Sequence, residues 1–242
     1  MGATLYTGGV VGLGTIWYED LKPPFRFFND NRQWLQMDKL GHFYSAYHLG
    51  RLGQDLLRPT RLSPAAKRWL GGGMGFLLLL PIEILDGFSP DYGASWGDLG
   101  ANLLGSLLVI SGQKRVQPKF SFWPSRWAEQ RPDLLGDHLL AQMLKDYNGQ
   151  RYWLSVRVKS WWMLSLGYSA EGMVYGDPHQ NRAMGYTAYR QYYLSLDLDL
   201  SGIKPRSAFL KTLLWIGQGI KIPAPALGWQ PNRGWRVYPL FF

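Results

Sequence analysis

The stretch "NRQWLQMDKLGHFYSAYHLGRLGQ", residues 31–54, combines a helical spacing of apolar and aromatic residues with ionisable side chains. Asp38 and His42 stand four residues apart on one helical face, and Lys39 lies next to them. Burying an unpaired carboxylate costs several kcal/mol, so such a group has to meet a cation, a hydrogen-bond donor or water. We therefore predict that this segment is a helix of a bundle in which these side chains find polar partners.

Two further segments have the length and composition of membrane-associated helices. They are "WLGGGMGFLLLLPIEIL" (69–85) and "ASWGDLGANLLGSLLVISG" (94–112), each near the lower limit of about 17 residues for a spanning helix. The uncharged segment 1–17 is a fourth candidate. Small residues recur four apart in three of these segments, as Gly8 and Gly12, as Gly71 and Gly75, and as Gly97, Ala101 and Gly105. Because such rows let backbones approach closely, residues 1–112 are predicted to form a tight, membrane-associated bundle of about four helices.

Two of these apolar helices also carry polar pairs, Glu83 with Asp86 and Asp98 with Asn102. Together with Asp38 and His42 they predict one buried polar cluster. Carboxylates and an imidazole are ligands for a divalent metal ion. Crowded carboxylates beside a histidine are equally suited to moving a proton.

The candidate residues follow from these two chemistries. The candidate catalytic residues are Asp38, His42, Glu83 and Asp98; the candidate metal ligands are Asp38, His42, Glu83, Asp86 and Asp98; Lys39 and Asn102 are supporting residues. A purely structural role stays open for the same residues: Asp86 at a helix end, Asp98 in a first helical turn, and Asn102 bonding a neighbouring helix. The cofactor is unknown, and a divalent metal ion is one candidate.

The second part of the chain, residues 113–242, has a different character. Residues 113–133 are basic, aromatic and broken by prolines, which indicates a linker or irregular surface segment. Strands are predicted at 151–159, 161–170, 192–201 and in the terminal "WRVYPLFF", and helices at about 132–147 and 206–220. The fold class is therefore α+β: a helical bundle followed by a small antiparallel sheet with one or two helices.

Composition indicates the kind of partner. Charged residues make up 18%, below the typical value of about 25%, and there are twelve tryptophans and fourteen tyrosines. Amphipathic rings favour a membrane interface, although an ordinary soluble domain with an aromatic core stays an alternative. Residues 1–112 contain nine Lys/Arg and nine Asp/Glu, so the net charge of +9 belongs to the second part. Without a dense basic run or a nucleic-acid-binding motif, this charge favours an anionic lipid or a lipopolysaccharide-like headgroup over nucleic acid. The absence of cysteine excludes disulfides, thiolate metal sites and a cysteine nucleophile.

Several longer motifs resemble a known family. They are "FFNDNRQWLQMDKLGHFYSAYHLGR", "IEILDGFSPDYGASWGDLGANLLG", "RPDLLGDHLLAQMLKDYNGQRYWLSV", "YRQYYLSLDLDL" and "IKIPAPAL". They are similar to domain-of-unknown-function family 2279 of Bacteroidetes envelope proteins. More distantly, the succession D-K-x-x-H, E, D-x-x-x-N-x-x-G resembles VanZ-like membrane proteins, and it falls on Asp38, Lys39, His42, Glu83, Asp98, Asn102 and Gly105. VanZ-like chains usually follow the Glu with a Gln and an Arg; here Asp86 stands at the Gln position, and no Arg lies between Glu83 and Asp98.

The resemblance implies an exported protein of the cell envelope, at the outer membrane or its periplasmic face, with the inner membrane as an alternative. It implies no particular reaction. Two functions are therefore expected: binding or processing of a lipid or glycolipid through the Asp/Glu/His cluster, or a non-catalytic structural or assembly role in an outer-membrane protein complex. The expected partners are a membrane lipid or lipopolysaccharide-like molecule and other envelope proteins.

Overall fold

The computed structural model describes residues 24–89, 93–231 and 233–242. The chain divides into two units, and the long helix α2 (Met37–Leu57) contributes to both. The described part of the first unit comprises residues 24–31 and 45–112, and the second unit comprises residues 32–44 and 113–242. The predicted first helix at 1–17 lies outside the described residues, and the boundary at residue 112 stays a prediction.

The first unit contains α3 (Pro64–Phe88), α4 (Trp96–Ile110) and the C-terminal part of α2. Helix α3 begins where Ser63 caps it by accepting a hydrogen bond from the Ala66 backbone N–H, with Pro64 in the first turn. Helix α4 begins in the same way at Ser95. Both helices lie where the sequence predicts them, with α3 longer than expected by several residues.

Glycines set the spacing between these helices. A Cβ atom at Gly75 of α3 would overlap the carbonyl oxygen of Ala46 in α2, and one at Gly71 would overlap the backbone of Gln54. On α4, Ala101 and Gly105 lie on the buried face. The predicted close approach at the 71/75 row is therefore confirmed.

Helix α3 is long and apolar enough to cross a membrane by length and composition, and 33% of its most apolar window is buried in the first unit. The core helix of a soluble protein meets the same criterion, so the finding is weak evidence for a membrane span.

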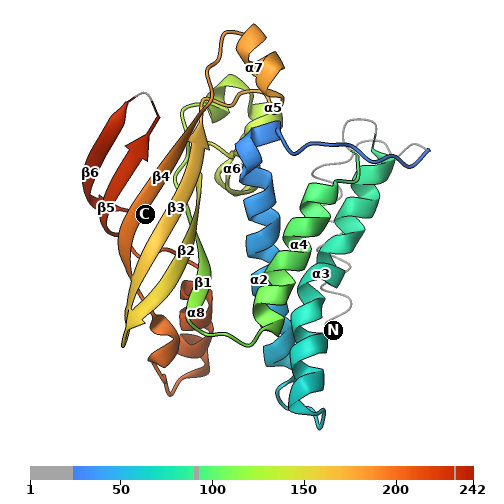
Figure 1. The fold of residues 1–242 in the computed structure, drawn as a ribbon, viewed down its shortest axis with the longest axis vertical. Helices are drawn as coiled ribbons and strands as arrows, with labels where there is room; N and C mark the ends of the chain where they lie inside the picture. The colour runs from blue at the N-terminus through green and yellow to red at the C-terminus, as the bar shows by residue number, and fades with distance from the viewer. Residues whose placement is uncertain (1–23, 90–92, 232) are drawn as a thin grey trace. The chain divides into compact units, whose positions relative to one another are not determined.

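The second unit is built on one six-stranded antiparallel sheet in the order β1 to β6, in which each strand pairs with the next along the chain (Figure 1). The strands are β1 (Val116–Phe122), β2 (Gln150–Lys159), β3 (Trp162–Glu171), β4 (Tyr189–Leu198), β5 (Ala224–Gln230) and β6 (Gly234–Phe241). The backbone of Phe120 in β1 also exchanges hydrogen bonds with Gly219 and Lys221, just before β5. The second unit therefore closes one edge of the sheet with its own chain.

Short helices complete the second unit, and Figure 1 shows α8 at one end of the strands and α5 and α7 near the other. They are η1 (Gln33–Gln36), η2 (Ala128–Gln130), α5 (Pro132–Leu135), α6 (Leu139–Lys145), α7 (Pro178–Ala183), η3 (Leu200–Gly202) and α8 (Ala208–Gly217).

Three sequence-based expectations need correction here. Residues 113–133 are not only a linker, because they contain β1. The helix expected at 132–147 is two short helices, separated at Gly136, whose φ of 96° ends the first. The described sheet has six strands, two more than expected, and the α+β class is confirmed.

Candidate functional site

A left-handed turn precedes α2 in the second unit. Trp34, Leu35 and Gln36 have φ values of 48°, 48° and 68°. Each left-handed non-glycine residue costs roughly 1–2 kcal/mol, so the surrounding structure has to hold this turn in place. The helix predicted over residues 31–54 therefore begins later, at Met37.

Three contacts hold the turn. The Trp34 N–H donates to the carbonyl oxygen of Gly176 at 2.9 Å, and the Tyr168 hydroxyl donates to that of Leu35 at 2.5 Å. Arg190 Nη2 donates to Gln36 Oε1 at 2.8 Å. The next residue, Met37, is fully buried in the core of the second unit. The turn therefore fixes where the first residues of α2 point.

Asp38, the second residue of α2, is the centre of the candidate site. Its Oδ2 accepts a hydrogen bond from Lys39 Nζ at 3.1 Å, and its Oδ1 accepts one from the Tyr147 hydroxyl at 2.9 Å. His42 Nε2 lies 3.8 Å from Oδ1, one helical turn further on. The side chains of Asp38 and His42 are 22% and 15% exposed, so the pair is mostly buried but still accessible to solvent.

The ionisation of Asp38 follows from these contacts. Burial alone raises its pKa, but the charges of His42 and Lys39 and the hydrogen bonds from Lys39 and Tyr147 outweigh burial and hold the pKa below its ordinary value. A carboxylate that stays ionised beside an imidazole can orient the ring and stabilise its protonated form. The arrangement can therefore exchange a proton with a bound group.

Tyr147 reaches Asp38 because its loop is fixed on both sides. Asp146 is fully buried and accepts hydrogen bonds from Ser125 through both of its oxygens. Asn148 donates to the carbonyl oxygen of Met173 at 2.9 Å and accepts from its N–H at 2.8 Å. Sequence reasoning missed these residues, although "KDYNGQ" is part of a motif that carries the family resemblance.

The rest of this helical turn is tightly packed. A Cβ atom added to Gly41 would lie only 3.0 Å from the hydroxyl oxygen of Tyr152. The ring of Tyr44 packs against the rings of Tyr152 and Phe120. The Tyr44 hydroxyl donates to the carbonyl oxygen of Gly219 at 3.1 Å, and burial raises its pKa to about 12. Tyr44 therefore stays a hydrogen-bond donor at physiological pH.

In the first unit, polar residues gather where α3 ends and α4 begins. Glu83, 2% exposed, accepts a hydrogen bond from the Ser95 N–H at 3.2 Å. The Ser95 hydroxyl donates to Asp30 Oδ1 at 2.5 Å and accepts from the Asp98 N–H at 3.2 Å. Asp30 thus contacts the N-cap of α4.

The remaining candidates of this unit lie on the same two helices. Asp98 is buried in the first turn of α4, where its charge favours the helix dipole, and Asn102 is fully buried one turn further on. Asp86 lies in the last turn of α3, and its carbonyl oxygen accepts the N–H of Ser89. The first unit therefore buries Glu83, Asp98 and Asn102 inside apolar helices, as the polar pattern predicts.

The seven candidate residues are thus divided between the units. Asp38, Lys39 and His42 belong to the second unit, and Glu83, Asp86, Asp98 and Asn102 to the first. A single cluster of all seven stays a prediction. In the second unit Lys39 supplies a cation to Asp38 Oδ2, and His42 lies beside Oδ1. The pair therefore suits proton transfer, and metal binding by Asp38 and His42 stays a prediction.

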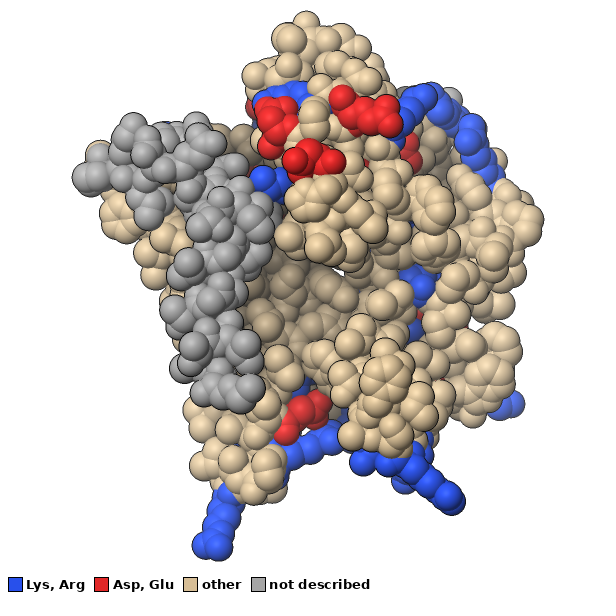
Figure 2. Space-filling model, turned by 180° about the vertical axis from the view of Figure 1, so that it is seen from behind, with Lys and Arg blue, Asp and Glu red and all other residues tan. Residues whose placement is uncertain are grey.

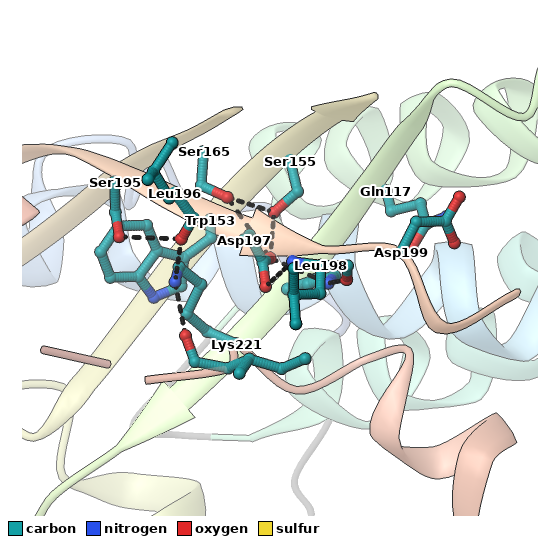
Figure 3. Close-up of polar contacts among 12 residues, drawn as sticks. Gln117, Trp153, Ser155, Ser165, Ser195, Leu196, Asp197, Leu198, Asp199 and Lys221 are labelled. Carbon is teal, nitrogen blue, oxygen red and sulfur yellow. Dashed lines mark hydrogen bonds and ion pairs between the residues drawn. The ribbon is translucent and has the colours of Figure 1, made fainter. Parts of the chain in front are cut away.

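A second polar network, which sequence reasoning also missed, lies on the inner face of the sheet (Figure 3). Lys119 Nζ and Asp197 Oδ2 are 2.8 Å apart, and both side chains are fully buried. Ser155 and Ser165 donate to the same carboxylate oxygen at 2.8 and 3.3 Å. Because the ion pair is hydrogen-bonded from several sides and sealed from solvent, its role is structural. The prolines around Lys119 concealed its strand.

A second buried lysine belongs to this network. Lys221 Nζ donates to the carbonyl oxygens of Leu196 and Ile222 at 2.8 and 2.6 Å and lies 5.1 Å from the centre of the Trp153 ring. Burial lowers its pKa to about 8, with Asp197 opposing this shift and Lys119 adding to it.

These features define a class of protein: an α+β protein with a helical unit that buries carboxylates, joined through a shared helix to an antiparallel sheet with a polar inner face. The family model described as "Predicted periplasmic lipoprotein (DUF2279)" matches residues 26–110. Neither curated proteins nor solved structures give a match. The resemblance to this family is thereby confirmed over these residues, whereas the VanZ-like resemblance and the Bacteroidetes source stay predictions. The match supports a place in the cell envelope, on its periplasmic side.

Proposed function

We propose that the protein binds or processes a lipid or glycolipid of the cell envelope, with His42 and Asp38 as the pair that exchanges a proton. The observation that supports this most directly is the ionised Asp38 carboxylate beside His42, held by Lys39 and Tyr147 behind a strained left-handed turn. Strained backbone of this kind occurs preferentially at functional sites.

In this proposal His42 accepts or delivers the proton, and Asp38 stabilises the charged imidazole. Lys39 and Tyr147 hold Asp38 in position. Glu83 and Asp98 stay candidate catalytic carboxylates, with Asn102 in support. We place the protein at the outer membrane or its periplasmic face, with a membrane lipid or a lipopolysaccharide-like molecule as its partner.

A second function, a non-catalytic subunit of an envelope protein complex, is favoured by one observation. Glu83 accepts the Ser95 N–H at the N-cap of α4, and Asp98 lies in the first turn of the same helix, where its charge favours the helix dipole. Both residues can thus stabilise the start of α4 without taking part in a reaction. In this case the polar residues fix the helices, and partners are other envelope proteins.

The test uses the full chain in detergent with phosphatidylglycerol, phosphatidylethanolamine or lipopolysaccharide as probes. Native mass spectrometry detects bound lipid, and chromatography of the extracted lipids detects any product. We expect His42→Gln and Asp38→Asn to bind less lipid, or to lower turnover by about a hundredfold, the range of general acid–base catalysis. The matched control is the exposed pair Asp137 and His138, whose side chains lie 2.7 Å apart; Asp137→Asn and His138→Gln should behave as wild type.

Equal lipid binding and turnover in all four variants would contradict the first function. Loss of a co-purifying envelope protein in Glu83→Gln, with the fold retained, would support the second.

The metal hypothesis has its own test. Elemental analysis of the purified wild type, Asp38→Asn and Glu83→Gln measures bound divalent ions directly. Because Lys39 neutralises Asp38, we expect no stoichiometric metal in the wild type. If the wild type contains one metal ion per chain and the folded Asp38→Asn variant contains none, Asp38 is a metal ligand. The proposal of proton transfer at this residue would then be wrong.

A further inference from the structure

Along β4 of the second unit the apolar residues are exposed and the polar residues are buried, the reverse of the pattern in an ordinary soluble sheet. In β4, Leu194 and Leu196 are 40% and 46% exposed, whereas the alternating Ser195 and Asp197 are 3% and 1% exposed. Soluble sheets bury the apolar face and solvate the other one. Here the inner face holds the Lys119–Asp197 network, and the outer face presents leucine and valine.

The register of the strands orders these apolar residues into rows across the outer face. One row is Val156, Leu164 and Leu196, and the next is Leu154, Leu166, Leu194, Leu227 and Val237. Every residue of both rows is exposed. We call these two rows the aliphatic band; it crosses five neighbouring strands.

Aromatic residues flank the aliphatic band at both ends. At one end Tyr192, Trp229 and Trp235 are paired across β4, β5 and β6, and all three are exposed. At the other end Trp161 and Trp162 stack on each other at the turn between β2 and β3, with ring centres 4.8 Å apart. Along β3, Trp162 lies at one aromatic end, and Tyr168, the strand partner of Tyr192, lies at the other. These two residues are six positions apart, which corresponds to about 20 Å. This length is close to the apolar height of roughly 25 Å in membrane-inserted sheets.

A basic segment lies at the Trp161 end of the aliphatic band. Residues 200–221, which contain η3 and α8, include Lys204, Arg206 and Lys211 and no acidic residue. This segment follows the Trp161 end directly, because the Asp199 N–H donates to the carbonyl oxygen of Trp161. Helix α8 also exposes apolar side chains: Phe209, Leu210, Leu213 and Ile216. The space-filling view shows that most of the visible described surface is uncharged (Figure 2).

We propose that the aliphatic band and α8 form a lipid-contacting surface, in which acyl chains cover the band and anionic headgroups meet the basic residues of 200–221. Aliphatic rows between aromatic rows match the change from hydrocarbon to headgroup, where tryptophan and tyrosine are favoured. A protein partner would require no such ordering by depth, and the basic end complements lipid phosphate. The proposal does not depend on the chemistry of Asp38 and His42.

The experiment uses the absence of native cysteine. Single cysteines replace Leu166 and Leu196 in the band, and Asp133, whose side chain is 72% exposed, as the control. Each full-length variant is spin-labelled, reconstituted into vesicles of phosphatidylethanolamine and phosphatidylglycerol, and examined for label accessibility to oxygen and to a water-soluble nickel chelate. We expect labels at 166 and 196 to be accessible to oxygen and protected from the chelate, and the label at 133 to stay accessible to the chelate.

Two results would overturn the proposal. One is chelate accessibility at 166 and 196 equal to that at 133 in vesicle-bound protein. The other is dipolar broadening between identical labels at 166 or 196, which would show that a second copy covers the band. A companion variant carries glutamine in place of Lys204, Arg206 and Lys211. Its affinity for these vesicles should fall at least tenfold. Unchanged affinity would show that these residues do not bind the anionic headgroups. Asp38→Asn should leave all label readings unchanged, so failure of the proposed function and failure of this surface are distinguishable.

Discussion

At the scale of single residues, Asp38 is largely buried and yet stays ionised, two properties that seldom occur together. It is shielded enough for its hydrogen bonds to be strong, yet it keeps its charge because Lys39 and Tyr147 contact opposite oxygens of the carboxylate. A neutral asparagine can accept one hydrogen bond but cannot balance the ammonium. The carboxylate is therefore a stability element as well as a candidate catalytic group.

Asp38→Asn should lower the free energy of unfolding by about 2 kcal/mol near neutral pH, the typical cost of losing a charged hydrogen-bond partner. The folded pKa is below the unfolded value, so this contribution is present above pH 4 and is lost as pH falls through the lowered pKa. Denaturant titrations between pH 3 and pH 7 measure the difference between wild type and variant. Asp55→Asn, on the same helix, is the control; a difference that stays constant down to pH 3 would contradict the assignment.

Lys221 gives a prediction for the alkaline range. Burial lowers its pKa from 10.5 to about 8, so the unfolded chain keeps a proton that the folded protein loses in this range. The free energy of unfolding of the wild type should therefore rise relative to Lys221→Met between pH 8 and pH 10.5, by about 3 kcal/mol in total. Parallel denaturant titrations at pH 7, 8, 9 and 10 measure this rise; parallel curves for the two proteins would show that Lys221 does not titrate there.

At the scale of secondary-structure elements, the packing of α2 and α3 depends on the absence of side chains. Gly71 and Gly75 face the backbone of α2 in the first unit, whereas a Cβ atom added to Gly73, on the same helix, would meet nothing within 4 Å. The same substitution should therefore have opposite effects at neighbouring positions.

Gly75→Ala should destabilise the protein by about 2 kcal/mol, since the methyl group overlaps Ala46 and Ser106. Gly73→Ala should stabilise it by about 0.5–1 kcal/mol through helix propensity alone. Thermal unfolding followed by circular dichroism in one detergent compares both with wild type. Equal midpoints for the two variants would show that α2 and α3 do not pack through this row.

Elements with a strong local signal could be predicted from the sequence. Helices α3 and α4 carry apolar runs behind serine caps, and β4 alternates cleanly. Strand β1 was missed because Pro118 and Lys119 lie within it. Pro118 argues against a strand, and the partners of Lys119, Asp197 and the carbonyl oxygen of Leu198, are distant in the sequence. The direction of the alternation in β4 was not predictable either, since period two does not say which face is buried.

The candidate site shows the same limit. The polar pairs on each helix followed from spacing, because residues four apart share a face. The partner of Asp38, Tyr147, lies 109 residues away, and the left-handed turn at Trp34 is imposed by contacts with Gly176, Tyr168 and Arg190. Contacts of this separation have no local pattern in a single sequence.

At the scale of the whole molecule, the two units share one helix rather than a flexible linker. Residues 32–44 supply Met37 to the core of the second unit and Tyr44 to its contacts with Phe120 and Tyr152. A fragment that starts at residue 113 would expose this core.

Fragment 113–242 should therefore fail to give a cooperative unfolding transition, whereas the same fragment with residues 32–44 attached through a glycine–serine linker should regain one. Near-ultraviolet circular dichroism reports on this directly, because fixed tryptophan and tyrosine rings give the signal. Cooperative unfolding of 113–242 alone would show that residues 32–44 are dispensable for the second unit.

The shared helix also has a consequence for the order in which the protein folds. A chain exported into the periplasm emerges with its N-terminus first, so residues 32–44 leave the translocation channel long before β1 to β6, with which they fold. Until the last strand follows, this segment has no sheet to join and exposes its aromatic side chains to solvent. We expect biogenesis to depend on a periplasmic chaperone that protects this early segment, and depletion of such a chaperone should cause loss of the protein during secretion.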